Sequence, residues 1–512
     1  MKRLMSLTMV VVLLVSLAAG LAAAEEDVIV VMGSSTFDPS TPAGAYLQEV
    51  TRLFMEQNPG IRVELNWGSW GDLWNKVGIM LSNRQGPDLL VGPREYLMAP
   101  GRGAGQWDDI LIVPEDKFLS PIQRQALGPA VLEATRFPGR GYMVWPWTLY
   151  VDGTMVVNGD MLRKAGYDPY QIQDNGWTID QFVEIARAVT KDTDGDGKVD
   201  QWAAYFGPVT GGHNGERIAH TGIFTHNIPY RLRGHNVWTA TFVDIKTGDL
   251  FLDEEAFLKG WRLIREMIDE GLIPRQSVGV AMDESREAFI HGMTAYSFDG
   301  PDLLNLVYER NNRIERGLEQ GEPFEPVVVP RPRFAGSDWV DFPITVIAHG
   351  FYSFKQEPYK GDQHTENVFK FAKFLTDPVF QVTLAHRQSI PPDMRVYYGE
   401  HAWFPGILGN DRNAQFIEEI PQYWKPQMGI YIQMAITDEL SQALQKYEME
   451  IVRPTREAVF LGNMTPEEGV AKLREELDKI DKAIPKERRL SPDAPAIAKD
   501  FDDFAKSIGQ KY

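Results

Sequence analysis

The 512-residue chain contains no cysteine. This absence excludes disulfide bonds, thiolate metal sites, a cysteine nucleophile and attachment of a lipid to an N-terminal cysteine. The chain also lacks an excess of positive charge, since 71 acidic residues against 52 lysines and arginines give a formal net charge of −19. Such an acidic balance argues against nucleic acid or an anionic membrane as the partner.

Apolar runs long enough to span a membrane are lacking after the first 24 residues. The N-terminus has the basic residues Lys2 and Arg3, an apolar stretch over 4–21 and then three alanines that end at Ala24. This order is typical of a secretory signal peptide, with a membrane anchor as the alternative interpretation. We expect cleavage near Ala24 and a free periplasmic protein, because no cysteine is available for an acylated anchor.

The composition is that of an ordinary globular protein, with 43% hydrophobic and 24% charged residues. A chain of this length is too long for one small core, so two or three domains are expected. Tryptophan is frequent, with 13 copies, and several of these lie close together in the sequence. We find no internal repeat and no low-complexity segment.

The first part of the mature chain alternates between strand-like and helical patterns. Residues 27–32 and 61–65 have the patterns of strands, and residues 43–58 have helical periodicity. A second helix over 72–81 and a short apolar strand over 89–91 follow. This alternation predicts a parallel sheet, in which ligands bind at the carboxyl ends of the strands.

Aromatic and polar side chains follow these predicted strands and several later ones. Sugars offer an apolar ring face, which packs on flat aromatic rings, and hydroxyl groups, which bond to carboxylates, arginines and amides. The sequence therefore predicts a carbohydrate-binding cleft, with each tryptophan having buried packing as its alternative role. The candidate ligand-binding residues are Ser35, Thr36, Trp67, Trp70, Arg94, Glu95, Trp145, Trp147, Asp152, Phe298, Asp299 and Trp424. Asp88, Trp177 and Trp261 are expected to be structural.

An acidic loop lies between a predicted helix over 177–189 and a strand at Trp202. Its spacing matches the first nine positions of an EF-hand loop, with Gly197 at the sharp turn. The twelfth position, normally a glutamate, is Ala203. The spacing predicts a structural Ca²⁺ site, with a solvated acidic turn as the alternative. The candidate metal ligands are the side chains of Asp192, Asp194, Asp196 and Asp200 and the backbone carbonyl of Lys198.

Six segments in this order resemble one known family: 54–63, 86–90, 156–182, 287–295, 371–377 and 464–468. They include Asn-Pro-Gly-Ile-Arg-Val at 58–63 and Trp-Thr-Ile-Asp-Gln-Phe at 177–182. On these motifs the chain resembles the extracellular solute-binding proteins of sugar ABC importers, the maltose-binding-protein-like family 1. The resemblance covers most of the mature chain, and some members of the family carry a similar acidic loop as a structural Ca²⁺ site.

The resemblance implies an α/β protein with the two-lobed clamshell of type II periplasmic-binding proteins. Each lobe would hold a mainly parallel sheet flanked by helices. The N-terminal lobe would contain residues 25–143 and 327–388, and the C-terminal lobe residues 144–326 and 389–512. The protein would act as a monomer that captures its ligand between the lobes and delivers it to the permease subunits of an ABC transporter in the membrane.

A secreted carbohydrate-active enzyme or a glycan-binding adhesin is the alternative function. A glycosidase needs two carboxylates, but among 71 acidic residues a suitable pair is always available and proves nothing. The motifs of serine hydrolases, zinc proteases and P-loop enzymes are missing from the sequence. We therefore expect a binding protein without enzymatic activity, and the number of aromatic candidates favours an oligosaccharide as the ligand.

Overall fold

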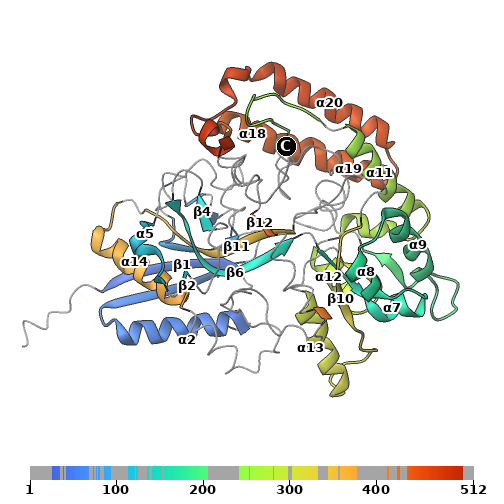
Figure 1. The fold of residues 1–512 in the computed structure, drawn as a ribbon, viewed down its shortest axis with the longest axis horizontal. Helices are drawn as coiled ribbons and strands as arrows, with labels where there is room; N and C mark the ends of the chain where they lie inside the picture. Colours follow the sequence, from blue (N-terminus) through green and yellow to red (C-terminus); the bar gives the residue numbers. More distant parts are fainter. Residues whose placement is uncertain are drawn as a thin grey trace, which may run out of the picture.

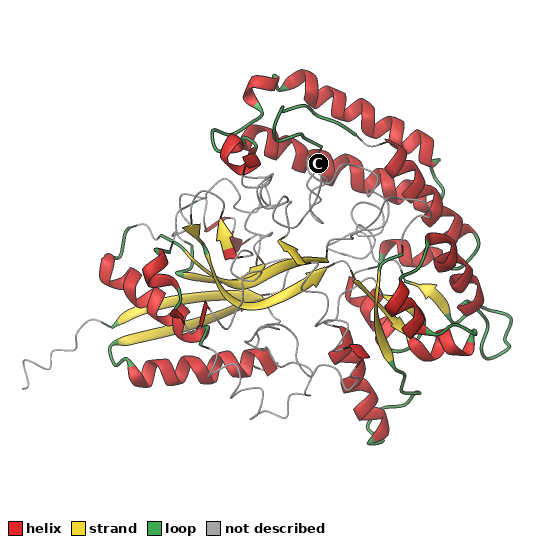
Figure 2. Cartoon of the chain, in the orientation of Figure 1, coloured by secondary structure: helices red, strands yellow, loops and turns green. Residues whose placement is uncertain are grey.

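The strands of the protein gather into two main sheets, each flanked by helices (Figure 2). The computed structural model describes residues 26–34, 39, 42–68, 73, 76–77, 79–80, 83, 86–93, 113–121, 123–124, 135–137, 141–152, 154–205, 242–252, 254–280, 282–297, 303–332, 344–355, 358–377, 412–413, 424–426 and 435–499. The predicted signal peptide, residues 1–24, lies outside this description.

The first sheet is built around β1 (Asp27–Ser34), which lies between β2 (Ile61–Gly68) and β3 (Leu89–Pro93). Both neighbours run parallel to β1. The alternation of strand and helix in this part of the sequence therefore correctly predicted a parallel sheet. Its buried side chains are mostly branched aliphatic residues, which suit a strand covered on both faces.

A strand from much later in the chain completes this sheet. β11 (Ile344–Ser353) runs antiparallel to β3 and to β6 (Val144–Asp152), and parallel to β12 (Trp424–Pro426). The strand order is β12-β11-β3-β1-β2. β6 lies off this path and pairs with the edge of β11 that is opposite to β3. The first lobe is thus assembled from segments that are far apart in the sequence.

The second sheet has the order β10-β7-β9-β8. β7 (Thr154–Asn158) runs antiparallel to both β10 (Pro326–Pro330) and β9 (Thr294–Ser297), whereas β8 (Trp202–Ala204) runs parallel to β9. The two-lobed α/β architecture is confirmed, but the expectation of a mainly parallel second sheet is wrong. Antiparallel neighbours arise here because β7 and β10 carry the chain into and out of the lobe in opposite directions.

The lobe boundaries also differ from those expected. β6 belongs to the first sheet and β7 to the second, so the chain first crosses after Asp152 and not between 143 and 144. β10 belongs to the second sheet, so the return crossing comes after Pro330 and not before residue 327. In both cases the hydrogen-bond ladder continues beyond the expected boundary, which the local sequence pattern does not reveal.

The segment 389–512 is shared between the lobes, although it was expected to lie in the second lobe only. β12 pairs with the first sheet. Asn413, in contrast, is buried against the outer edge of β10, where its side-chain oxygen accepts from the Val328 amide at 3.0 Å and its nitrogen donates to the Pro326 carbonyl at 2.8 Å. The amide thereby satisfies backbone groups that an edge strand would leave unpaired.

Helices α2 (Pro42–Gln57) and α14 (Asp362–Leu375) pack against each other on the first lobe (Figure 1). Phe54 lies at their contact, with its ring 4.8 Å from that of Phe371 and 5.3 Å from that of Phe374. All these distances are those of favourable aromatic pairs. The returning segment is therefore joined to the N-terminal segment by side chains as well as by the β11 ladder.

In the second lobe α7 (Gly159–Lys164), α8 (Pro169–Asn175) and α9 (Ile179–Val189) follow β7. Thr178 caps α9, since its hydroxyl accepts from the amide of Gln181, whose side chain accepts in turn from the Thr178 amide. This reciprocal pair is a capping box, and it fixes the start of the helix.

Trp177, directly before this cap, is only 2% exposed and has the structural role that was expected. Its ring lies 5.5 Å from Phe182 and from Tyr296, and its Nε1 donates to the carbonyl of Pro330 at 2.7 Å. The indole therefore holds the end of β10, where the chain leaves the second lobe.

The C-terminal helices arch across the top of the view, from the second lobe to above the first sheet (Figure 1). Helix α11 (Glu254–Asp269) packs against α19 (Arg453–Leu461) and α20 (Pro466–Ala483). The contact centres on Trp261, which is fully buried as expected, and on Gly469, where a Cβ would approach the indole to 2.7 Å. Further elements are α5 (Glu115–Phe118), β4 (Arg136–Phe137), β5 (Gly141–Tyr142), η4 (Arg275–Gly279), α12 (Met282–Ile290), α13 (Leu303–Glu315), α18 (Asp438–Tyr447), η7 (Glu448–Val452) and η8 (Lys486–Arg488).

Within the described ranges, none of the helices combines the length and the apolar character that a membrane crossing requires.

Trp145 is part of the core of the first lobe. Its side chain is fully buried, its ring lies 5.2 Å from Phe118 and 5.8 Å from Phe369, and its Nε1 donates to Ser353 Oγ at 3.2 Å. The expectation that Trp145 contacts the ligand is therefore wrong. In β6 this residue pairs with Phe351 of β11, and its side chain lies under α5 and α14, away from the carboxyl ends of the parallel strands.

Replacing Trp145 with alanine should lower the free energy of unfolding by about 3–5 kcal/mol, because the change removes a large buried ring and leaves a cavity. Urea unfolding would measure the loss. Leu306→Ala, at a position that is 41% exposed on α13, is the matched control and should cost about 0.5 kcal/mol or less. Wild-type stability of the Trp145→Ala protein would contradict the core assignment.

Gly350 allows β6 and β11 to approach closely. A Cβ at this position would lie 2.1 Å from the carbonyl oxygen of Trp145 and 2.6 Å from Val144 Cγ1. At Gly68, by contrast, the nearest atom to an added Cβ is 3.9 Å away, in Leu73.

We predict that Gly350→Ala lowers the free energy of unfolding by at least about 2 kcal/mol, because backbone must move to admit the methyl group. Gly68→Ala should change it by less than about 1 kcal/mol. Urea midpoints of the two variants would measure the difference, and equal midpoints would argue against the close approach at Gly350.

Candidate functional site

The carboxyl ends of the parallel strands meet at one edge of the first sheet, which we call the ligand edge. Ser34, the last residue of β1, pairs with Gly68, the last residue of β2, and β3 ends beside them at Pro93. The segments that follow all three strands therefore start from neighbouring positions. Ligands of open α/β sheets bind at such an edge.

Five of the twelve predicted ligand-binding residues come within two positions after these strands, whereas Phe298 and Asp299 follow β9 of the second sheet. Seven of the candidates lie outside the described residues. These are Ser35, Thr36, Trp70, Arg94, Glu95, Phe298 and Asp299. Their role as ligand contacts stays a prediction.

Trp67 is a candidate whose side chain the structure describes. It lies in β2, opposite Gly33 of β1 and one residue before the end of the strand. Its side chain is half-buried and packs against the core of the first lobe, so that part of the indole stays accessible. A partly covered ring at a strand end is suited to stacking on an apolar sugar face.

Trp147 lies at a β-bulge in β6. Pro146 pairs with Gly350 of β11 and Thr148 pairs with His349, so Trp147 is an extra residue without a partner in the ladder. Bulges of this kind redirect the strand locally and occur often beside binding sites. Because His349 pairs on its other side with Pro93, the bulge lies level with the end of β3, across β11, at the ligand edge.

The bulge separates the two neighbouring tryptophans of the sequence. Trp145 is buried in the core, as described above, whereas the backbone of Trp147 lies at the ligand edge. His349, also at this edge, was not among the predicted residues. No local pattern marks it, because its position depends on the pairing of β11 with two strands that precede it in the chain by more than two hundred residues.

Asp152 and Trp424 flank the start of β11. Trp424 of β12 pairs with Ile344, and Asp152 of β6 pairs with Thr345, so the two backbones lie on opposite sides of the same strand. This is the part of the first sheet from which β6 continues into the second lobe. Their side chains lie outside the description, and their contact with ligand stays a prediction.

The acidic loop folds so that three of its carboxylates converge. Oxygen atoms of Asp192, Asp194 and Asp200 lie within 4.8 Å of one another. Three oxygen ligands at such distances suit a hard cation, which needs further oxygens from the backbone or from water. Asp196 is not part of this group, and Ala203, at the twelfth position, is buried in β8.

Backbone amides hold the loop in this shape. The amide of Gly197 donates to Asp192 Oδ2 at 2.7 Å, and that of Gly195 donates to Asp192 Oδ1 at 2.6 Å. These two bonds lower the pKa of Asp192 below its ordinary value. Asp200 closes the loop, since its carboxylate accepts from the amide of Thr193 at 2.9 Å and from the Thr193 hydroxyl at 2.6 Å.

Solved structures share this fold across almost the whole chain. An ABC substrate-binding protein from Listeria monocytogenes in complex with cycloalternan has a TM-score of 0.60 and 15% identity, covering 89% of this chain and 98% of that one. A solute-binding protein from Thermotoga lettingae bound with alpha-D-tagatose has a TM-score of 0.59 and 16% identity, covering 89% and 99%. The GacH receptor of Streptomyces glaucescens, studied with acarbose, has a TM-score of 0.58 and 15% identity, covering 88% and 98%.

A sequence profile of the bacterial extracellular solute-binding proteins matches residues 38–382. This match covers most of the first lobe and much of the second, including β2 to β11 but not β1. It also agrees with the type II clamshell of the solved structures. Proteins of this family bind solutes for ABC transporters and are not enzymes. The chain belongs to the family of bacterial extracellular solute-binding proteins.

Proposed function

We propose that the protein is the substrate-binding component of an ABC importer and captures an oligosaccharide between its two lobes. The observation that carries this proposal is the family match over residues 38–382 on a fold shared with sugar-bound solute-binding proteins. Closure of the lobes around the ligand would then present a changed surface to the permease subunits in the membrane.

An oligosaccharide is favoured over a single sugar by the ligands of the similar structures and by the aromatic residues at the ligand edge. Cycloalternan and acarbose are both larger than one sugar unit, although tagatose is not. Trp67, half-buried at the end of β2, offers one stacking surface. The backbone of Trp147 lies at the same edge, at the bulge of β6, and we propose its ring as a second stacking surface for a further sugar ring.

We further propose that the protein works outside the cytoplasm, in the periplasm, as a monomer. Family membership supports an extracellular place of action. The basic and apolar pattern of residues 1–24 supports export with cleavage near Ala24.

A thermal-shift panel of maltotriose, mannotriose, acarbose and tagatose would test the ligand class. We expect an oligosaccharide to raise the melting temperature, since a ligand that binds only the folded state stabilises it by mass action. Trp67→Ala should weaken binding of that sugar by about tenfold or more, measured by calorimetry, because one stacking surface is lost. Tyr359→Ala is the matched control and should bind normally, since Tyr359 is an exposed aromatic residue that precedes α14.

Two outcomes would contradict the proposed function. One is hydrolysis of a bound glycan at a rate that disappears when a carboxylate is replaced, which would identify an enzyme. The other is sugar binding by the Trp67→Ala protein with unchanged affinity, which would place the ligand elsewhere.

We also propose that the acidic loop holds a structural Ca²⁺ through Asp192, Asp194 and Asp200. The convergence of their oxygens within 4.8 Å supports this proposal. Asp196 lies outside this group, and its role as a ligand, like that of the Lys198 carbonyl, stays a prediction. The ion would brace the connection between α9 and β8, and we do not expect it to be the transported solute.

Removal of the metal should reveal this role. We expect EDTA to lower the melting temperature of the wild-type protein and added Ca²⁺ to restore it. Asp192→Asn should abolish the response to both, whereas Asp478→Asn, a charge-matched change at an exposed position on α20, should retain it. A wild-type melting temperature that is identical in EDTA and in Ca²⁺ would contradict the metal site.

A further inference from the structure

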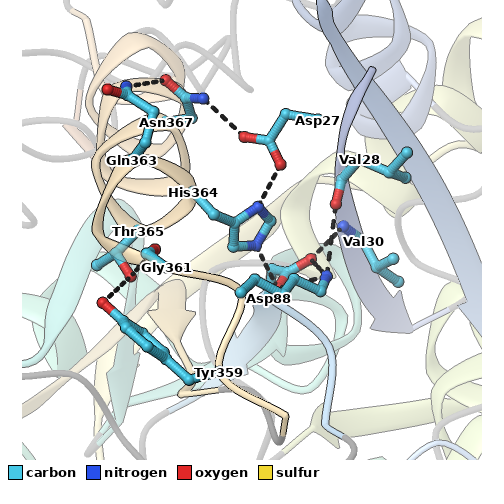
Figure 3. A network of polar contacts seen from close by, with 11 residues as sticks. Asp27, Val28, Val30, Asp88, Tyr359, Gly361, Gln363, His364, Thr365 and Asn367 are labelled. Atoms are coloured by element: carbon cyan, nitrogen blue, oxygen red, sulfur yellow. Dashed lines mark hydrogen bonds and ion pairs between the residues drawn. The ribbon is translucent and has the colours of Figure 1, made fainter. Parts of the chain in front are cut away.

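A buried polar cluster lies at the opposite edge of the first sheet, where β1 and β3 begin (Figure 3). Asp27 is the first residue of β1, Asp88 directly precedes β3, and His364 projects between them from α14. The side chain of Asp88 is 1% exposed and that of His364 is 7% exposed. Buried charged groups are costly unless they are paired, so the pairing in this cluster matters for the lobe.

Both ring nitrogens of His364 face a carboxylate. Nδ1 lies 2.5 Å from Asp27 Oδ1, and Nε2 lies 2.8 Å from Asp88 Oδ1. An ionised carboxylate only accepts hydrogen bonds, whereas a neutral imidazole carries one hydrogen and one lone pair. A neutral ring would therefore direct its lone pair at one of the two carboxylates. Both carboxylates receive a hydrogen bond from the ring only when His364 is an imidazolium.

The remaining polar atoms of the cluster are also paired. Asn367 donates to Asp27 Oδ2 at 2.6 Å, and the backbone amide of Val30 donates to Asp88 Oδ2 at 2.8 Å. Lys360 Nζ lies 3.0 Å from Asp88 Oδ2 and 3.1 Å from Oδ1. With His364 protonated, two carboxylates face two cations, and the cluster is neutral.

Several other charged groups on and around α14 have partners of their own. On α14 itself, Asp362 accepts from the hydroxyl of Tyr359, Glu366 pairs with Lys117 of α5, and Lys370 donates to Asn58. On α2, Arg52 pairs with Glu56 at the surface. The described contacts of β6 with the helix are apolar, as between Trp145 and Phe369. The charges that face His364 are therefore those of Asp27, Asp88 and Lys360.

We propose that His364 is a pH-sensitive clip that fastens the returning segment 358–377 to the N-terminal strands of the first lobe. As an imidazolium it bonds to β1 and to the start of β3 at once, and on losing its proton it can bond to only one of them. The proposal rests on these contacts alone and does not depend on the proposed carbohydrate ligand.

The electrostatics of the cluster give the direction of the effect. Burial alone would lower the pKa of His364, but its hydrogen bonds to Asp88 and Asp27 outweigh burial and raise that pKa. The clip therefore contributes fully below the pKa that histidine has in the unfolded chain, and its contribution is lost as the pH rises through the raised pKa of the folded protein.

At low pH, protonation of the Asp27 carboxylate limits the stability that the clip contributes. Burial alone would raise the pKa of Asp27, but hydrogen bonds from Asn367 and His364 outweigh burial and lower it. Its contribution is present above the pKa of an unfolded aspartate and is lost as the pH falls through the lowered value. The clip is thus strongest in mildly acidic surroundings, which a protein outside the cytoplasm can meet.

His291 offers a matched control. Its Nε2 lies 3.1 Å from Glu287 and its Nδ1 lies 3.6 Å from Glu319, so it too stands between two carboxylates. Its side chain is 48% exposed, however, and it lies outside the first lobe, directly after α12. Water can replace either partner of an exposed group, so little stability depends on the charge of this ring.

The test compares the wild-type protein with His364→Gln and His291→Gln at about pH 5.5 and about pH 8.5. Urea midpoints report stability, and hydrogen exchange of the peptide 362–375 reports whether α14 is released. We expect His364→Gln to lower the urea midpoint and to speed hydrogen exchange in α14 clearly more at the lower pH. At the higher pH the difference in midpoint between this variant and the wild type should become smaller. For His291→Gln the difference in midpoint from the wild type should be the same at both pH values.

A second measurement remains informative if His364→Gln fails to fold. Titration of the histidine rings by NMR in the wild-type protein should show His364 losing its proton at a higher pH than an unfolded histidine. Asp27→Asn should move that transition to lower pH, because one of the two carboxylates becomes neutral. A difference in urea midpoint between His364→Gln and wild type that is the same at both pH values would overturn the proposal. So would loss of the His364 proton at a pH equal to or lower than that of an unfolded histidine.

Discussion

The hydrogen-bond ladder between β6 and β11 is the constraint on which the two-lobed arrangement depends. β6 leads from the first sheet into the second, and β11 pairs with it antiparallel after the chain has returned. The same ladder contains the bulge at Trp147 and the glycine at 350 that permits the close approach. Any bending between the lobes during ligand capture would therefore act on strands that also form the ligand edge.

Features that depend on neighbours in the sequence were predictable. The parallel arrangement of β1, β2 and β3 follows from the alternation of strands with a helix, and the start of α9 follows from the Thr178 and Gln181 capping pair. The structural role of Trp177 could be predicted as well, from its place directly before that helix. Family membership could be predicted from the order of several short motifs, each of which is weak alone.

Features that depend on distant pairing could not be predicted. Trp145 and Trp147 are equivalent in a local pattern, and only the register with β11 shows that one is core and the other lies at a bulge. The expected positions of the lobe boundaries differ from the sheet membership of β6 and β10 for the same reason, since the hydrogen-bond ladders continue past the points where the local pattern changes. The contacts of His364 with Asp27 and Asp88 join residues more than 270 positions apart, so no spacing reveals them.

Closure of the two lobes around a carbohydrate is the event on which the proposed function depends. Small-angle X-ray scattering of the protein alone, and saturated with the oligosaccharide that stabilises it most, tests this claim directly because lobe closure makes the molecule more compact. We expect a smaller radius of gyration in the saturated sample at an unchanged molecular mass. An unchanged radius at full saturation, or a mass that corresponds to a ligand-bridged dimer, would contradict it.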